Sequence, residues 1–196
     1  IDLHGNPGSE KTLPGVKSVR YTLQTTDPTG EGSTLTGQDI ELRTGGNLVS
    51  SFVAPAEPDM DAVFADVRSA VRVVENEAGQ QYRPADDVNE IGPWHANEVY
   101  RVYMDAEATL IEGESQSVAS ITLSEGWNWI PYPLAAILSV DDALSSIADQ
   151  LVLLKDETGR VYAPDKEVDV LTQMAPGEGY KVYVRQSTTL DYPEVS

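Results

Sequence analysis

Carboxylate side chains are the residues of this chain whose types and spacing could do chemistry. Two acids that flank a glycosidic bond can hydrolyse it, and several carboxylate oxygens together can bind Ca²⁺. The candidates are Asp59, Asp61, Asp86, Asp87, Asp141, Asp142, Asp156 and Asp165. The chain has 32 Asp and Glu residues, so some pairs must lie close by chance, and it has no Asp-x-Asp-x-Asp-Gly loop. We therefore expect no catalytic residue, no metal site and no cofactor, with calcium binding as the alternative.

Other catalytic groups are scarce. The two histidines, His4 and His95, have no counterparts in the repeat described below, and a single histidine is far more often structural than catalytic. The chain has no nucleophile elbow, no phosphate-binding loop and no His-Glu-x-x-His pattern. It also has no cysteine, which excludes disulfides, thiolate catalysis and iron–sulfur clusters. The sequence predicts a protein that is not an enzyme.

Aromatic side chains are the remaining candidates for a binding site. Trp127, Trp129 and Tyr132 lie close together and could stack on the rings of a glycan. The alternative is that aromatic residues alternating along a strand pack against their cross-strand neighbours in a core. Tyrosines that recur in both copies of the repeat favour the core interpretation; they are Tyr82 with Tyr162, Tyr100 with Tyr180 and Tyr103 with Tyr183.

The net charge of the chain restricts the classes of partner that it can bind. The formal net charge is −19, and no basic patch interrupts it, so we expect no nucleic acid as a partner. No segment approaches the roughly 20 apolar residues of a membrane span, so we expect no membrane insertion. A dispersed acidic surface with few lysines is typical of halophilic proteins, and an ordinary acidic secreted protein is the alternative. The chain starts at Ile1, which is consistent with a removed leader or a trimmed start.

An internal repeat with an offset of about 80 residues sets the domain organisation. The matching segments are 40–42 with 121–123, 46–49 with 127–130, 77–84 with 157–164, 98–103 with 178–183, and 108–110 with 188–190. So many ordered matches at one spacing indicate duplication. We predict an N-terminal arm (1–37) and two repeat domains (38–115 and 119–196).

Each copy predicts the same order of elements. Ser139 and Asp59 can cap a helix of two to three turns, since apolar residues follow at helical spacing. The two apolar stripes are Leu144, Ile147, Ala148 and Leu151, and Val63, Phe64, Val67 and Val71. In the second copy the predicted strands are 121–123, 127–134, 151–155, 160–163, 179–185 and 189–192, with a hairpin turn at 157–159. The predicted fold class is α+β and β-rich: two tandem small antiparallel-sheet domains, each with one short helix, plus an extended N-terminal arm.

Three segments of the second copy carry a resemblance to a known module. They are GWNWI (126–130), KDETGRVYAP (155–164) and PGEGYKVY (176–183). This pattern resembles an uncharacterised GWNLIS…KDGxGxxYxP…GxGYxVY repeat in exported surface proteins of the Bacteroidota and Rhodothermota type. The first copy departs from it, because Gly46 replaces the tryptophan and Val99 replaces the second glycine of the Gly-x-Gly-Tyr step. The resemblance implies an extracellular β-rich repeat without known chemistry.

The N-terminal arm has no counterpart in the repeat. It is rich in Gly, Pro, Thr and Ser, a composition that is poor for autonomous order. One run alternates as a strand would and presents Val19, Tyr21 and Leu23 to one face. Such a strand could complete the sheet edge of a neighbouring subunit, so we predict that these three residues make assembly contacts.

These observations lead to three hypotheses for function. The first is a non-enzymatic structural subunit on the exterior of a larger assembly, either a surface filament or a virion surface, whose partners are copies of itself or other subunits. The second is a carbohydrate-binding or adhesive module of an exported surface protein, and the third is a hydrolase that uses paired acids. The first two place the chain outside the cell, on a cell surface or on a virion surface.

Overall fold

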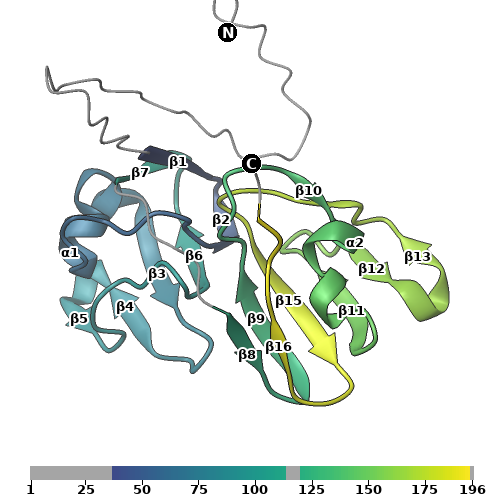
Figure 1. Ribbon diagram of the computed structural model, residues 1–196. Helices are drawn as coiled ribbons and strands as arrows, with labels where there is room; N and C mark the ends of the chain where they lie inside the picture. The colour runs from purple at the N-terminus through teal and green to yellow at the C-terminus, as the bar shows by residue number, and fades with distance from the viewer. Residues whose placement is uncertain (1–36, 114–119, 195–196) are drawn as a thin grey trace, which may run out of the picture.

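The computed structural model describes residues 37–113 and 120–194, which we call the first half and the second half (Figure 1). The protein is rich in β-strands, which form several antiparallel sheets accompanied by a few short helices. The three predicted arm residues, Val19, Tyr21 and Leu23, lie outside the described residues. Within the described ranges, no helix is long and apolar enough to span a membrane.

Each half contains a five-stranded antiparallel sheet. In the first half the spatial order is β2 (Gly45–Val49), β6 (Tyr100–Met104), β3 (Val71–Glu75), β4 (Gln81–Arg83) and β5 (Val88–Asn89). In the second half it is β9 (Gly126–Pro131), β15 (Gly179–Val184), β11 (Leu151–Lys155), β12 (Val161–Ala163) and β13 (Val168–Asp169). Segments that match in sequence therefore occupy matching places in the two sheets.

Smaller sheets complete each half. β1 (Gly37–Leu42) pairs with β7 (Ala108–Gly113), and β8 (Ile121–Leu123) pairs with β16 (Thr188–Leu190). The second half also has β10 (Leu138–Ser139) paired with β14 (Gln173–Met174). Figure 1 shows the two halves side by side, with the first half in blue and teal and the second in green and yellow.

Alternation along the central strands builds two separate cores. In β6 and β15 every second side chain is buried, namely Tyr100, Val102 and Met104 in one and Tyr180, Val182 and Val184 in the other. Each half has its own cluster of buried apolar residues around these strands. The two inward tyrosines use their hydroxyls alike, because Tyr100 accepts the backbone N–H of His95 at 2.9 Å and Tyr180 accepts that of Ala175 at 2.8 Å. The prediction that the recurring tyrosines belong to the core is confirmed for Tyr82, Tyr100 and Tyr180, which are buried, and is wrong for Tyr183, which is exposed.

The helical segments begin where the sequence predicts, but their α-helical part is shorter than predicted. Asp59 accepts the backbone N–H of Asp61, and Ser139 accepts that of Asp142, so both predicted caps are confirmed. In the described part of the chain, α-helix is confined to α1 (Met60–Val63) and α2 (Val140–Ala143); 3₁₀ turns η1 (Ala65–Ala70) and η3 (Ser145–Ile147) follow. The predicted helix of two to three turns is therefore wrong in length.

Pairing within the sheets explains why the helices end early. Val71 and Leu151, counted in the helical stripes, instead begin β3 and β11, where they pair with Met104 and Val184. The chain must leave the helix before these residues. In the second half, a 3₁₀ turn of three residues keeps Leu144 and Ile147 on one face, and both are buried.

The predicted hairpins join β3 to β4 and β11 to β12. Gly79 and Gly159 take positive φ in the turns, at 80° and 85°, which favours glycine. Asn76 and Asp156 hold the turns alike: each side chain accepts the backbone N–H four residues later, at 2.9 Å. A 3₁₀ turn follows the second strand of each hairpin, η2 (Pro84–Asp86) and η4 (Pro164–Lys166).

Candidate binding site between the two halves

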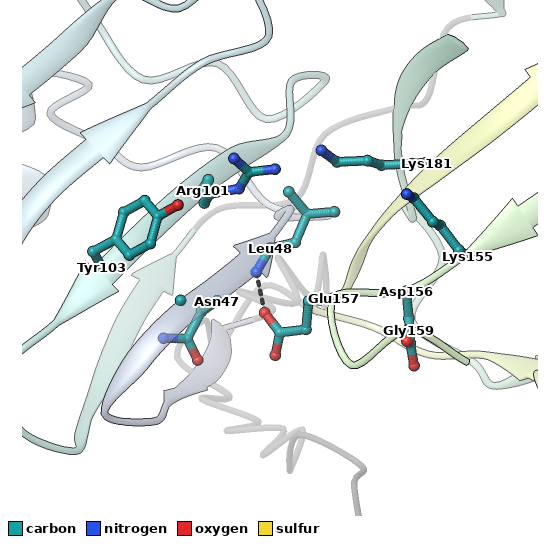
Figure 2. A pocket seen from close by; sticks show the side chains of 10 residues that line it. Asn47, Leu48, Arg101, Tyr103, Lys155, Asp156, Glu157, Gly159 and Lys181 are labelled. Carbon is teal, nitrogen blue, oxygen red and sulfur yellow. Dashed lines mark hydrogen bonds between the residues drawn. The ribbon is translucent and has the colours of Figure 1, made fainter. Parts of the chain in front are cut away.

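Reciprocal carboxylate contacts join the two halves. The carboxylate of Glu157 accepts the backbone N–H of Leu48 (Figure 2), and the carboxylate of Glu77 accepts that of Trp129 at 2.8 Å. Leu48 matches Trp129 in the repeat, and Glu77 matches Glu157. Each half thus reaches from its hairpin turn to the outer strand of the other, β2 or β9. Strands at the edge of a sheet leave N–H groups unpaired, and these carboxylates satisfy one on each edge.

A second set of contacts at the junction is one-sided. Ser50, which is fully buried, donates its backbone N–H to Gly177 O at 3.2 Å, and its hydroxyl donates to Glu178 O. The same hydroxyl accepts the backbone N–H of Tyr132 at 2.9 Å. Pro131 occupies the matching position in the second half and has no N–H to donate, so the mirror-image bond cannot form there.

Three cationic side chains converge beside these contacts. Lys155 Nζ lies 4.7 Å from the ring centroid of Trp127, and Lys181 Nζ lies 4.3 Å from that of Trp129. The guanidinium carbon of Arg101, from the first half, lies 5.0 Å from the same Trp129 ring. Figure 2 shows Arg101 and Lys181 reaching toward each other across the junction, with Lys155 beside Lys181. Cations at these distances are attracted to the electron-rich faces of indole rings.

These cations line a cleft of about 340 Å³. Its other lining residues come from β2, β6 and the hairpin turn of the second half, and include Gly46, Tyr103 and Glu157. Gly46 stands where the second half has Trp127, so no indole covers this part of the sheet. The cleft therefore opens over the strand that departs from the repeat pattern.

Burial and the neighbouring cations both affect the pKa of one lysine of the cluster. Burial, followed by the nearby charges of Arg101 and Lys155, lowers the pKa of Lys181, and Glu75 and Glu77 oppose this shift. Lys155 and Lys181 lie directly opposite each other on β11 and β15, an arrangement that is unfavourable for like charges. Neither lysine forms an ion pair with any residue that the structure describes, whereas Arg101 lies 3.9 Å from Glu75.

The three predicted glycan-stacking residues have different environments. The Trp127 side chain is 49% exposed and meets the half-exposed Tyr183 edge to face, with ring centroids 5.4 Å apart. Trp129 is half-buried against Arg101 and Lys181. Tyr132 is fully buried, and its hydroxyl donates to Ala136 O at 2.7 Å, so its ring cannot receive a glycan. Trp129 therefore lies at the junction, Trp127 lies beside Lys155 of the cleft, and Tyr132 belongs to the core.

Three residues of the site, Arg101, Lys155 and Lys181, were not predicted from the sequence. The sequence did contain a signal for the two lysines. The predicted hairpin and the alternation of apolar and polar residues along 179–185 place Lys155 and Lys181 on the outward faces of neighbouring strands. The approach of Arg101 could not be predicted, since it depends on how the two halves meet.

The candidate acids form local structural contacts. Asp61 accepts the Tyr82 hydroxyl at 2.6 Å, and Asp141 accepts that of Tyr162. Asp156, which is buried, pairs with Arg160 at 2.6 Å. Two further acids pair with arginines, Asp86 with Arg83 and Asp165 with Arg185. In the described part of the chain, no three His, Asp or Glu residues come close enough to hold a metal ion.

His95 takes no part in the site. His95 is exposed and donates its backbone N–H to the Tyr100 hydroxyl, while His4 lies outside the described residues.

The junction thus offers edge-strand contacts, exposed aromatic rings and three cations. Comparison of the chain with protein-family models, with curated proteins and with solved structures finds no match.

Proposed function

We propose that this chain is a non-enzymatic structural subunit on the exterior of a larger assembly, built from two copies of one domain. The observation that carries the proposal is the reciprocal junction, in which Glu77 and Glu157 each bind the matching outer strand of the other half. Contacts of this kind suit a rigid building block. The duplication is further supported by the equal strand order of the two sheets.

Matching details within each half support the same proposal. Asn47 accepts the backbone N–H of Arg43 at 2.8 Å, and Asn128 accepts that of Ser124 at 2.9 Å. Each asparagine also donates to the carbonyl of the same partner. Shared side-chain bonds of this kind follow from descent of both halves from one domain better than from chance.

Variants of the N-terminal arm would test whether the chain assembles with neighbouring subunits. We propose that Val19, Tyr21 and Leu23 add a strand to a neighbouring subunit, because main-chain pairing supplies affinity and the apolar side chains set the register. Deletion of residues 1–25, or replacement of Tyr21 and Leu23 by Asp, should leave folded, soluble monomers. Sedimentation and electron microscopy of these variants beside the parent would test this. Assembly of the truncated chain at the parental concentration would contradict it.

A second candidate function is carbohydrate binding by an exported adhesive module, and a specific observation favours it. Trp127 and Tyr183 form an edge-to-face pair whose members are both large and exposed. Exposed aromatic surface of this kind marks binding sites more often than isolated apolar residues do. Glycan binding that is lost in Trp127→Ala and kept in Trp127→Phe would support this function.

A further inference from the structure

We propose that the cleft between the halves binds the carboxylate of an acidic sugar, with Lys155 and Lys181 as the groups that recognise the anion. This inference rests on the carbohydrate-binding function proposed above and names its ligand class. It concerns the residues of Figure 2 together with the exposed Trp127.

The first argument is the concentration of cations in an acidic protein. The whole chain has 13 Lys and Arg residues against 32 Asp and Glu, yet three of the cations meet in this one cleft. Burial, together with repulsion from Arg101 and Lys155, lowers the pKa of Lys181. An anion bound between them would relieve that repulsion, so the arrangement is one that a negatively charged ligand would stabilise.

The second argument is the state of the nearby carboxylates. Glu157 and Glu77 bind backbone N–H groups across the junction, and the buried Asp156 is paired with Arg160. Lys155 and Lys181 make no ion pair within the described part of the chain, so their ammonium groups keep donors for a ligand. Their ammonium groups lie over the faces of the Trp127 and Trp129 rings.

The third argument selects a sugar among anions. Lys155, which lines the cleft, also lies over Trp127, a 49% exposed indole that meets Tyr183 edge to face outside the lining of the cleft. An aromatic face can pack against the apolar C–H face of a pyranose while an ammonium group binds its carboxylate. A cleft of about 340 Å³ has room for one or two sugar units. The ligand that fits both features is a uronic acid within a glycan.

Net charge limits the length of glycan that can bind. A charge of −19 repels a polyanion at long range, but at about 0.15 M salt the Debye length is only about 8 Å. Contacts inside the cleft are screened much less than this long-range repulsion. A short oligomer at moderate salt is therefore the appropriate probe.

The experiment uses the full chain and two ligands with the same sugar backbone: a trimer of galacturonic acid, and the same trimer with every carboxylate neutralised as its methyl ester. Titration calorimetry at about 0.15 M NaCl should show the acid binding about 10-fold or more tightly than the ester, because a hydrogen bond to a charged group contributes about 1.5–3 kcal/mol. Lys155→Gln and Lys181→Gln should reduce binding of the acid to the level of the ester. Lys181→Arg should retain it, since the charge is kept.

The matched control is Lys166→Gln, which removes the same charge from an exposed lysine that does not line the cleft. Thermal melts of every variant would show that binding changes do not reflect unfolding. Equal binding of acid and ester, unchanged by the lysine substitutions, would overturn the anion site and leave carbohydrate binding standing. If neither trimer bound, both the anion site and carbohydrate binding would be overturned for this ligand class.

Discussion

Val99 and Gly179 occupy matching positions in the two copies of the repeat, and they meet each other at the junction. A Cβ atom placed on Gly179 would lie 2.5 Å from Val99 Cγ1 and 3.1 Å from Leu48 Cγ. Residues that match in sequence thus meet each other where the two halves join. The Val99 side chain fills the space in front of Gly179, so a side chain at position 179 would collide with it.

Gly179→Ala should therefore destabilise the protein by overpacking, by about 1–3 kcal/mol in the free energy of unfolding. Urea denaturation of the full chain would measure the change. Val99→Ala in the same chain should restore much of the loss, because it removes the methyl group that the new Cβ would strike. If the two substitutions were simply additive, Val99 and Gly179 would not be in contact.

Removal of each junction carboxylate should affect one specific amide in the opposite half. Glu157→Ala should speed hydrogen exchange at the Leu48 amide, and Glu77→Ala should speed it at Trp129, because each N–H loses its acceptor. Each change should also cost about 1 kcal/mol of stability. Glu107→Ala, at an exposed acid outside the junction, is the matched control. Equal exchange at both amides in all three variants would show that the halves do not meet this way.

Tyr162 should make the free energy of unfolding depend on pH in the alkaline range. Its hydrogen bond to Asp141, and to a lesser degree burial, raises the pKa of Tyr162 to about 12. Because this lies above the ordinary value of 10.0, the folded state favours the neutral phenol, so the contribution is complete below about pH 10 and is lost as pH rises toward 12. The stability difference between the parent and Tyr162→Phe should therefore shrink across that range.

Urea unfolding of both proteins at several alkaline pH values would test this dependence. Asp141→Asn is the control variant, because it should bring the tyrosinate titration of Tyr162 back toward the ordinary pKa. A difference between parent and Tyr162→Phe that stays constant with pH would show that the hydrogen bond does not favour the neutral phenol.

Salt should stabilise the protein if its acidity is a halophilic adaptation. Raising NaCl from low to molar concentration should increase the melting temperature, because screening weakens repulsion among charges that sum to −19. A nonionic osmolyte at matched osmolality would separate screening from general exclusion effects. A melting temperature that stays flat or falls with NaCl would favour an ordinary acidic protein.

The local elements of this protein follow from short-range patterns in its sequence. Apolar residues alternate along 100–104 and 179–184 and mark the faces that are buried, since side chains of a strand point to opposite faces in turn. Turn glycines predicted the hairpins, and Asp59 and Ser139 predicted the helix starts, because each depends on hydrogen bonds or torsions within a few residues. The helix ends were not predictable this way, since strand pairing of Val71 and Leu151 sets them.

The tertiary structure alone decided what the outward faces contact. Alternation shows that Arg101 and Lys181 point away from their own cores, yet it carries no information about what lies opposite them. Their convergence on Trp129 depends on docking between segments about 80 residues apart. That docking depends on the side-chain volumes at Val99 and Gly179 and on the carboxylate acceptors of Glu77 and Glu157. These contacts form only once both halves are folded.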